Sequence, residues 1–159
     1  MIIEVYGMKS ICFVCEGNIC RSPIAEFLMR HLLEQANMDK DYIVFSRGLV
    51  SDTRGEDTYS LSKEQLRKHG IPFFTHSVQK INRAEYDDSD YVIVMDEYNI
   101  VLLKRLFFLR GPVKAKKLLS FTGENKDIQD PYYTRNFDVA YDAIEKGCHA
   151  FLDYLKKNG

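Results

Sequence analysis

Short apolar runs alternate along the chain with segments in which apolar residues recur every three or four positions. The short runs are typical of buried strands, and they cover residues 11–15, 42–46, 91–96 and 113–120. The recurring pattern is typical of helices with one apolar face, and it covers residues 22–36, 60–70 and 136–157. Strands and helices in this alternation predict an α/β fold with one open parallel sheet of about four strands and helices on both faces.

The ends of the helices carry residues with known terminal preferences. Ser22 is the expected N-cap of the first helix, Pro23 stands at the favoured first helical position, and Gly70 predicts the end of the second helix. The first strand and first helix are then joined by CEGNICRS, residues 15–22, which we call the cysteine loop. In open parallel sheets, ligands bind beyond the carboxyl ends of the strands, where this loop falls.

Length and composition are those of an ordinary globular protein. The 159 residues fit one domain, and no repeat, low-complexity tract or linker divides them. The net charge of −1 provides no general attraction to nucleic acid or membranes, so local groups must hold any anionic ligand. The chain has no apolar run of about 18 residues and no signal-peptide pattern at its start. We therefore expect a cytoplasmic protein that binds neither nucleic acid nor membrane.

Three of the four cysteines, Cys12, Cys15 and Cys20, lie close together, and Cys148 is far away. Such a distribution does not suit a secreted disulfide scaffold, so reduced thiols are expected. The C-x2-C-x4-C spacing superficially matches half of a zinc or iron–sulfur site. However, strand residues at odd separation point to opposite faces, so Cys12 and Cys15 diverge and we expect no metal site.

Two other roles remain for the cysteines. A tight loop brings Cys15 and Cys20 within reach of a disulfide, which needs Cα atoms within about 7 Å. Cys12 and Cys148 are interpreted as small buried apolar residues, the commonest role of a free cysteine.

The cysteine loop has the features of an anion site. A loop between a strand end and a helix start directs backbone N–H groups and the positive end of the helix dipole into one concavity. Gly17 permits close approach of the backbone to a ligand, and Arg21 adds a planar charged fork for two phosphate oxygens. The same field favours the thiolate of Cys15, a nucleophile beneath a bound phosphate. Ser22 is placed to donate a hydrogen bond to this sulfur, which is compatible with a capping role.

The segment VCEGNICRSP, residues 14–23, resembles the low molecular weight protein tyrosine phosphatase signature C-x-G-N-x-C-R-S-P at every fixed position. DPYY, residues 130–133, matches the family's general-acid segment, and HGIP, THSVQKI and DYVIVMDEYN fall where the family's histidine loop and third strand would be. The resemblance implies a flavodoxin-like fold and a phosphatase domain over residues 8–159. Residues 1–7 are then an N-terminal extension.

The resemblance also implies roles for individual residues. Cys15 is the nucleophile, Arg21 stabilises the transferred phosphoryl group, and Asp130 is the general acid and base. The other phosphate-binding and substrate-binding residues are Glu16, Gly17, Asn18, Ile19, Cys20, Ser22, Tyr132 and Tyr133, the two tyrosines forming an aromatic wall for the phosphotyrosine ring. Asn18, Ser46 and His76 form a supporting network, with Asp96 close to the histidine. Cys20 is also a redox guard for Cys15.

Two departures from the family pattern affect the pocket rim. The family often carries an arginine three residues after the loop histidine, where this chain has Gln79 followed by Lys80. Segment 46–59, which in relatives often brings an aromatic residue to the rim, offers Asp52 and Thr53 instead. These differences bear on peptide preference.

Three rival functions are weighed against phosphotyrosine hydrolysis. Arsenate reductase of the related fold needs two further cysteines in mid-chain, and residues 21–147 contain none. A protein-arginine phosphatase typically has threonine at the position of Ile19 and lacks the tyrosine pair. A non-catalytic phosphate-binding module would not need both Cys15 and Asp130. We therefore expect a cofactor-independent phosphatase acting on phosphotyrosine proteins or peptides, binding phosphate-like oxyanions, and monomeric, with a weak dimer as the alternative.

Overall fold

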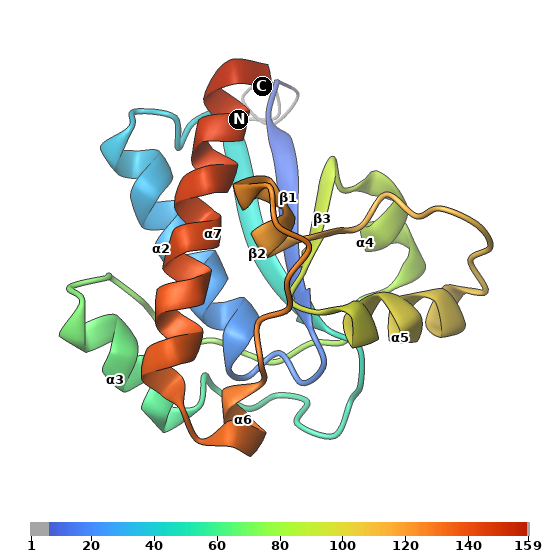
Figure 1. The fold of residues 1–159 in the computed structure, drawn as a ribbon, viewed down its shortest axis with the longest axis horizontal. Coiled ribbons are helices and arrows are strands. Elements are labelled where there is room, and N and C mark those ends of the chain that lie inside the picture. The colour runs from blue at the N-terminus through green and yellow to red at the C-terminus, as the bar shows by residue number, and fades with distance from the viewer. Residues whose placement is uncertain (1–6, 159) are drawn as a thin grey trace.

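The sheet determines where the other elements lie. In the computed structural model, which describes residues 7–158, parallel strands lie in the order β2-β1-β3-β4. Their bounds are Lys9–Cys15 for β1, Tyr42–Gly48 for β2, Tyr91–Val94 for β3 and Lys116–Lys117 for β4. Cys15 pairs with Gly48, and Val14 pairs with Val94. The carboxyl ends of these strands therefore meet at one edge of the sheet, in the lower part of Figure 1.

Helices cover both faces of this sheet (Figure 1). On one face lie α2 (Arg21–Gln35), α3 (Ser60–Lys68) and α7 (Phe137–Asn158), and on the other lie α4 (Arg83–Asp88) and α5 (Glu97–Phe107). The 3-10 helix η1 (Leu118–Thr122) packs against α7, and the single turn α6 (Pro131–Thr134) lies near the carboxyl edge of the sheet. The prediction of a parallel sheet with helices on both faces is confirmed.

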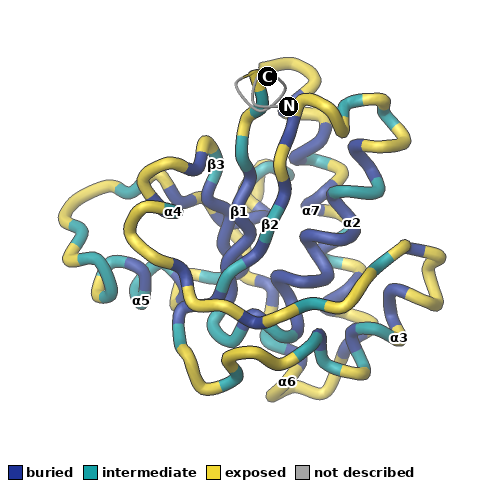
Figure 2. Tube along the Cα trace, turned by 180° about the vertical axis from the view of Figure 1, so that it is seen from behind, coloured by how far each residue is buried: buried dark blue, intermediate teal, exposed yellow. Residues whose placement is uncertain are grey.

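Side-chain alternation in β1 divides the core into two layers. Ile11, Phe13 and Cys15 face α2 and α7, whereas Cys12 and Val14 face α4 and α5. All five residues are buried, and Figure 2 shows buried chain along the strands and the inner sides of α2 and α7. Because the period of a strand is two, Cys12 and Cys15 point to opposite faces, as the sequence predicts.

The beginning of α2 corrects the sequence prediction. The helix starts at Arg21 with Cys20 as its N-cap, so Ser22 does not cap it and Pro23 is its third residue. The physical reason is that the Ser22 hydroxyl lies 3.0 Å from the sulfur of Cys15. Gly70 does follow the end of α3, with a φ of +68° that suits glycine.

The third and fourth strands are shorter than expected. β3 ends at Val94, and Asp96 instead caps α5, where its side chain accepts the N–H of Asn99. Of residues 113–120, only Lys116 and Lys117 are strand, because the chain then turns into η1. The helices α4, α5 and α6 were not predicted. The apolar run 100–103 gives no clean helical period, although Asp96 and Asn99 form a capping box.

Two further expectations concern the ends of the chain and membranes. Of the proposed extension 1–7, residues 1–6 lie outside the described residues. Within residues 7–158, every helix is too short or too polar to cross a membrane.

Candidate active site

The cysteine loop turns its carbonyl groups outward. The carbonyl groups of residues 16–20 all accept hydrogen bonds from the surrounding chain. Backbone N–H groups donate to two of them: Leu49 (2.9 Å) and Val50 (3.2 Å) to Glu16, and Tyr59 (2.8 Å) to Ile19. Side chains donate to the other three: Thr53 Oγ1 to Gly17 (2.8 Å), His76 Nε2 to Asn18 (2.9 Å) and Ser62 Oγ to Cys20 (3.4 Å). The C=O and N–H of one trans peptide unit point in opposite directions. The N–H groups of residues 17–21 therefore face the interior of the loop and form a concave set of donors.

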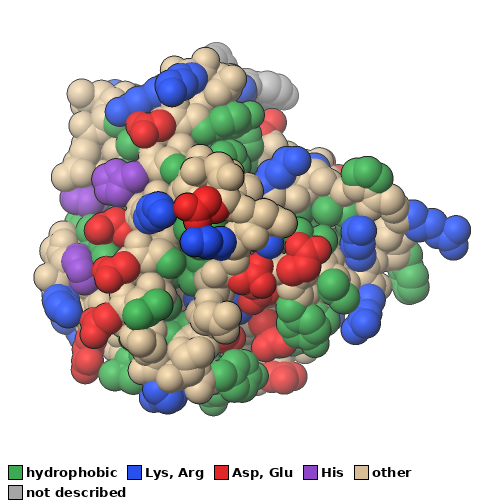
Figure 3. Space-filling model, viewed as in Figure 1, with side chains coloured by type: hydrophobic (Ala, Val, Ile, Leu, Met, Phe, Trp, Pro, Cys, Tyr) green, Lys and Arg blue, Asp and Glu red, His purple; other side chains and the backbone are tan. Residues whose placement is uncertain are grey.

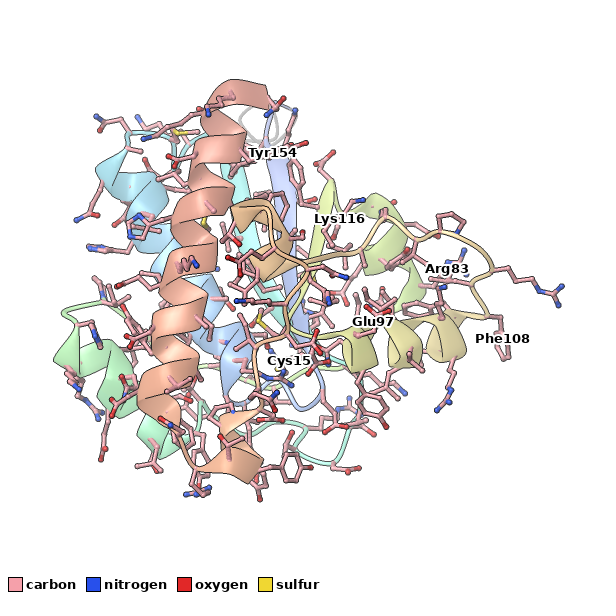
Figure 4. All side chains as sticks on the ribbon, viewed as in Figure 1. Cys15, Arg83, Glu97, Phe108, Lys116 and Tyr154 are labelled. Atoms are coloured by element: carbon pink, nitrogen blue, oxygen red, sulfur yellow. The ribbon has the colours of Figure 1, made fainter. Side chains whose placement is uncertain are left out.

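The sulfur of Cys15 lies inside this concavity. It accepts the backbone N–H of Asn18 at 3.2 Å and lies 3.0 Å from Ser22 Oγ. Cys15 is the last residue of β1, and α2 begins at Arg21, so the sulfur also lies near the positive end of a 15-residue helix. Figure 4 labels Cys15 at this end of the sheet. Backbone donors and the helix dipole both favour a negative charge on the sulfur and on any ligand above it.

Asn18 holds the shape of the loop. Its backbone is left-handed, with a φ of +58°, a conformation that asparagine tolerates better than most residues. The fully buried side-chain amide donates to Ser22 Oγ (2.9 Å) and Ser46 Oγ (3.0 Å), and its oxygen accepts the N–H of Gln79 (3.2 Å). Ser46 in turn donates to Glu26 Oε1 at 2.7 Å. The Asn18 side chain therefore ties the loop to two other parts of the chain, at Ser46 and at Gln79.

Gly48 leaves the space that Asn18 occupies. A Cβ atom on Gly48 would lie 3.0 Å from Asn18 Cβ and 3.2 Å from the carbonyl oxygen of Glu16. Because both neighbours belong to the cysteine loop, only glycine allows the end of β2 to approach the loop this closely.

Arg21 places a buried positive charge in the site. Its side chain is 2% exposed, and it donates to Asp96 Oδ2 at 2.5 Å, to the Ile128 carbonyl at 2.7 Å and to Asp130 Oδ2 at 3.4 Å. Burial lowers the pKa of Arg21, but the charges of Cys15, Asp130 and Asp96 outweigh burial and raise it. The buried Nε–H has no hydrogen-bond partner within residues 7–158. Arg21 is therefore a permanent cation with one donor that no described residue uses.

Asp130 lies across the pocket from the loop. It caps α6, with Oδ1 accepting the N–H of Tyr132 at 3.0 Å, and Pro131 occupies the first helical position. Tyr132 and Tyr133 are 46% and 70% exposed and stand beside it with their rings edge to face. A pocket of about 230 Å³ is lined by Cys15, Glu16, Gly17, Ile19, Cys20, Val50, Asp52, Thr53, Asp130, Tyr132 and Tyr133. Asp52 and Thr53 thus lie at the rim.

A second hollow of about 400 Å³ adjoins this pocket. The two share Glu16, Asp130 and Tyr133, and the second also contains Arg21 and Asp96. Acidic side chains gather on this face of the molecule between α5 and α6 (Figure 3). Larger hollows of about 470 and 590 Å³ have no residue of the cysteine loop in their walls.

His76 and Asp96 each contact a different residue of the cysteine loop. Besides its bond to Asn18, His76 is anchored through its backbone N–H, which donates to Asp57 Oδ1 at 2.8 Å. Burial raises the pKa of Asp57, but the hydrogen bonds from Lys63, His76 and Thr58 outweigh burial and lower it. Asp96 pairs with Arg21, whereas the hydrogen bonds of His76 among the described residues go to Asn18 and Asp57. The buried cation at Arg21 is the stronger partner for that carboxylate.

The four cysteines are free thiols and all are buried. Burial raises the pKa of Cys12 and Cys148 far above the ordinary range. Burial, followed by the charges of Cys15 and Asp130, raises the pKa of Cys20 to about 12. Among residues 7–158, His, Cys, Asp and Glu side chains form no group of three suited to a metal ion.

Sequence reasoning missed several residues that shape the site. Gly48 and Glu26 support Asn18, and Tyr59 and Arg135 contact the segment that carries Asp130. Neither Tyr59 nor Arg135 is a residue type that typically caps a helix, and the two residues that contact each other are distant in sequence. Only the folded chain brings these contacts together.

Known proteins with similar sequences and structures were compared with this chain. The family model described as low molecular weight phosphotyrosine protein phosphatase matches residues 10–159. The Staphylococcus aureus protein named low molecular weight protein-tyrosine-phosphatase PtpA is 40% identical over 154 residues, which cover 95% of this chain and 96% of that protein. The crystal structure of YfkJ from Bacillus subtilis superposes with a TM-score of 0.89 at 34% identity, covering 94% and 96% of the two chains. DARP, the Drosophila arginine phosphatase, superposes with a TM-score of 0.83 at 31% identity, covering 96% and 100%.

Proposed function

This chain belongs to the low molecular weight phosphotyrosine protein phosphatase family, and we propose that it hydrolyses phosphotyrosine in proteins through a covalent phosphocysteine on Cys15. The observation that carries the proposal is the position of the Cys15 sulfur, surrounded by inward-facing N–H groups and close to the buried cation of Arg21. This arrangement binds a dianion directly above a nucleophile.

In the first step, the Cys15 thiolate attacks phosphorus in line with the tyrosyl oxygen. A sulfur–phosphorus bond forms as the oxygen–phosphorus bond breaks, and the phosphoryl group is transferred to Cys15. The loop N–H groups and the Nε–H of Arg21 donate to the equatorial oxygens. These donors are already oriented, so little reorganisation accompanies the charge that develops in the transition state.

Asp130 supplies the proton for the departing tyrosyl oxygen. Its carboxyl belongs to a residue that lines the same pocket as Cys15, and Pro131 restricts the backbone that carries it. After the tyrosine leaves, the same carboxylate accepts a proton from water, which attacks phosphorus and releases inorganic phosphate and the Cys15 thiolate. Ser22 stabilises this thiolate as it leaves by donating a hydrogen bond to the sulfur.

The walls of the pocket favour an aryl phosphate. Tyr132 and Tyr133 present two partly exposed rings beside Asp130, and Ile19 adds an apolar side. A phosphotyrosine ring stacks or packs edge to face against such a wall. Phosphoarginine is the alternative substrate, because an arginine phosphatase has the same fold at 31% identity.

The remaining features of the proposed enzyme follow from the charges in the site. Arg21 and the loop N–H groups supply the positive charge that a metal ion provides in other phosphatases, so we propose catalysis without a metal or cofactor. We also propose that the enzyme is a cytoplasmic monomer, with a weak dimer as the alternative, and that it binds neither nucleic acid nor membrane. Cys20 protects Cys15 by forming a disulfide with it under oxidation.

The deciding experiment compares peptides carrying phosphotyrosine, phosphoserine and phosphoarginine, each with and without a metal chelator. The proposal predicts the highest kcat/KM for phosphotyrosine, unchanged by the chelator. A higher kcat/KM for the phosphoarginine peptide would identify the enzyme as an arginine phosphatase instead. Loss of turnover in the presence of the chelator would overturn the metal-independent mechanism. In Asp130→Ala, kcat/KM should fall by about 10²–10⁴ for phenyl phosphate and much less for 4-nitrophenyl phosphate, because only the poorer leaving group needs the proton.

A further inference from the structure

The segment that carries Asp130 has little stability of its own. Its helix α6 is a single turn of four residues, and isolated turns of this length do not form in water. Tyr133 is 70% exposed and Tyr132 is 46% exposed, so burial of these two rings holds the turn only in part. A general acid must nevertheless lie within hydrogen-bond reach of the leaving oxygen. Other residues therefore have to fix segment 130–135.

Arg135 closes the turn from its C-terminal end. Its backbone N–H donates to the Pro131 carbonyl at 2.8 Å, and its guanidinium donates to the Tyr132 carbonyl at 3.3 Å and to the Tyr59 hydroxyl at 3.1 Å. The guanidinium carbon also lies 5.5 Å from the ring centroids of both Tyr59 and Phe137. One side chain thus joins the backbone of α6 to the aromatic residues beneath it.

The backbone conformation of Arg135 would suit glycine better than arginine, which indicates that the arginine side chain is needed at this position. Its φ of +61° is left-handed, a conformation that glycine adopts freely and that costs other residues about 1–2 kcal/mol. Glycine is the usual residue at this place after a helix. The contacts of the guanidinium offset the strain that arginine introduces here.

Tyr59 connects the same segment to the cysteine loop. Its N–H donates to the Ile19 carbonyl at 2.8 Å, which is one of the bonds that turn the loop carbonyls outward. Its ring meets Tyr132 edge to face at 5.6 Å and stacks on Phe137 at 5.7 Å. Tyr59 therefore contacts both halves of the pocket, the loop that binds phosphate and the turn that carries the acid.

We propose that Tyr59 and Arg135 are positioning residues that hold Asp130 in register with the cysteine loop. This inference rests on the proposed function, because it assumes that Asp130 protonates the leaving group. Neither residue lines the pocket around Cys15. Their effect on turnover passes through the placement of Asp130, so it increases with the need of the substrate for a proton.

The test measures kcat/KM for phenyl phosphate and 4-nitrophenyl phosphate, together with thermal stability, in a small set of variants. Arg135→Gly removes the guanidinium and also relieves the left-handed backbone. Arg135→Lys keeps the charge without the paired donors, and Tyr59→Phe removes only the hydroxyl that accepts from Arg135. The matched control is Phe108→Gly, since Phe108 is also left-handed, with a φ of +54°, and lies at the far end of α5 from Cys15 (Figure 4).

We expect Arg135→Gly to lose about threefold to tenfold in kcat/KM for phenyl phosphate, with less than about twofold loss for 4-nitrophenyl phosphate. Arg135→Lys should show the same selective loss, Tyr59→Phe a smaller one, and Phe108→Gly none. The melting temperature of Arg135→Gly should stay close to that of the parent, because strain relief offsets the lost contacts.

Two results would overturn the inference while the parent enzyme still hydrolyses both esters. One is equal loss for the two esters in Arg135→Gly, which indicates a general structural effect. The other is no loss for either ester. If the parent enzyme hydrolyses neither ester, the proposed function itself fails, and the two failures are thereby distinguished.

Discussion

The hydroxyl of Ser22 lies beside the sulfur of Cys15, within hydrogen-bond distance. The oxygen of Ser22 lies 3.0 Å from that sulfur and accepts the side-chain N–H of Asn18 at 2.9 Å. A thiolate has no proton to donate, so in the thiolate form of Cys15 that the proposed mechanism requires the Ser22 hydroxyl is the donor. A donated proton stabilises a thiolate more than it stabilises a sulfur bonded to phosphorus.

Ser22→Ala should therefore slow the breakdown of phosphocysteine more than its formation. We expect about a tenfold fall in kcat, with an initial burst of 4-nitrophenol in rapid-mixing measurements, because without this hydrogen bond the Cys15 thiolate is a poorer leaving group when water attacks the phosphocysteine. Ser62→Ala is the matched control, since Ser62 bonds to the Cys20 carbonyl without contacting Cys15. An unchanged kcat in Ser22→Ala would remove this serine from the mechanism.

Asn18→Ala should damage both stability and activity. It removes three hydrogen bonds from a fully buried side chain and leaves alanine in a left-handed backbone. Denaturant titration should show a loss of about 2–4 kcal/mol in the free energy of unfolding. Asn37→Ala shares the left-handed backbone at an exposed position and should lose only about 1 kcal/mol, with normal turnover. Similar losses in the two variants would contradict the role of the Asn18 network.

Gly48→Ala should lower activity by displacing the cysteine loop. The new methyl group would press on Asn18 and on the Glu16 carbonyl, and we expect at least about a tenfold fall in kcat/KM. Gly147→Ala provides the control, because its methyl group would lie 2.5 Å from Leu118 Cγ, within the core and away from the pocket. That variant should lose about 1–3 kcal/mol of stability yet keep normal turnover when folded. Normal turnover in Gly48→Ala would show that the loop tolerates the added atom.

Peroxide should inactivate the enzyme reversibly through Cys15 and Cys20. Peroxide oxidises the Cys15 thiolate to a sulfenic acid, and the Cys20 thiol then displaces water to form the disulfide. The charge of Cys15 is one cause of the high pKa of Cys20, about 12. Oxidation of Cys15 removes that charge and so favours deprotonation of Cys20 as the disulfide forms.

Activity should return with dithiothreitol in the parent enzyme and in Cys148→Ala, and should be lost permanently in Cys20→Ser, where Cys15 proceeds to the sulfinic acid. Mass spectrometry of the treated protein identifies the disulfide. A Cys20→Ser enzyme that recovers as fully as the parent would remove Cys20 from this role.

Much of the site was predictable because its residues are close in sequence. Cys15, Gly17 and Arg21 of the cysteine loop all lie within residues 15–21, between a strand and a helix that the apolar pattern marks clearly. Local order along the chain is enough to place such residues in one concavity.

The errors arise where distant residues compete for one side chain. Ser22 has the chemistry of an N-cap, but Cys15 and Asn18 engage its hydroxyl. Asp96 forms an ion pair with the buried cation of Arg21, 75 positions away, which was not predicted. Tyr59 and Arg135 are 76 positions apart, and their contact exists only after the sheet has brought the loops together. Local patterns carry no information about such pairs.

The proposed mechanism depends on the covalent phosphocysteine, and trapping this intermediate shows whether it forms. The enzyme is mixed with a phosphotyrosine peptide, quenched in acid within milliseconds and digested, and the peptide containing Cys15 is examined by mass spectrometry. We expect one phosphoryl group on Cys15, absent in Cys15→Ser, which should still bind inorganic phosphate without turning over substrate. Full turnover by Cys15→Ser, or a phosphoryl group on any other residue of the active enzyme, would contradict the proposed mechanism.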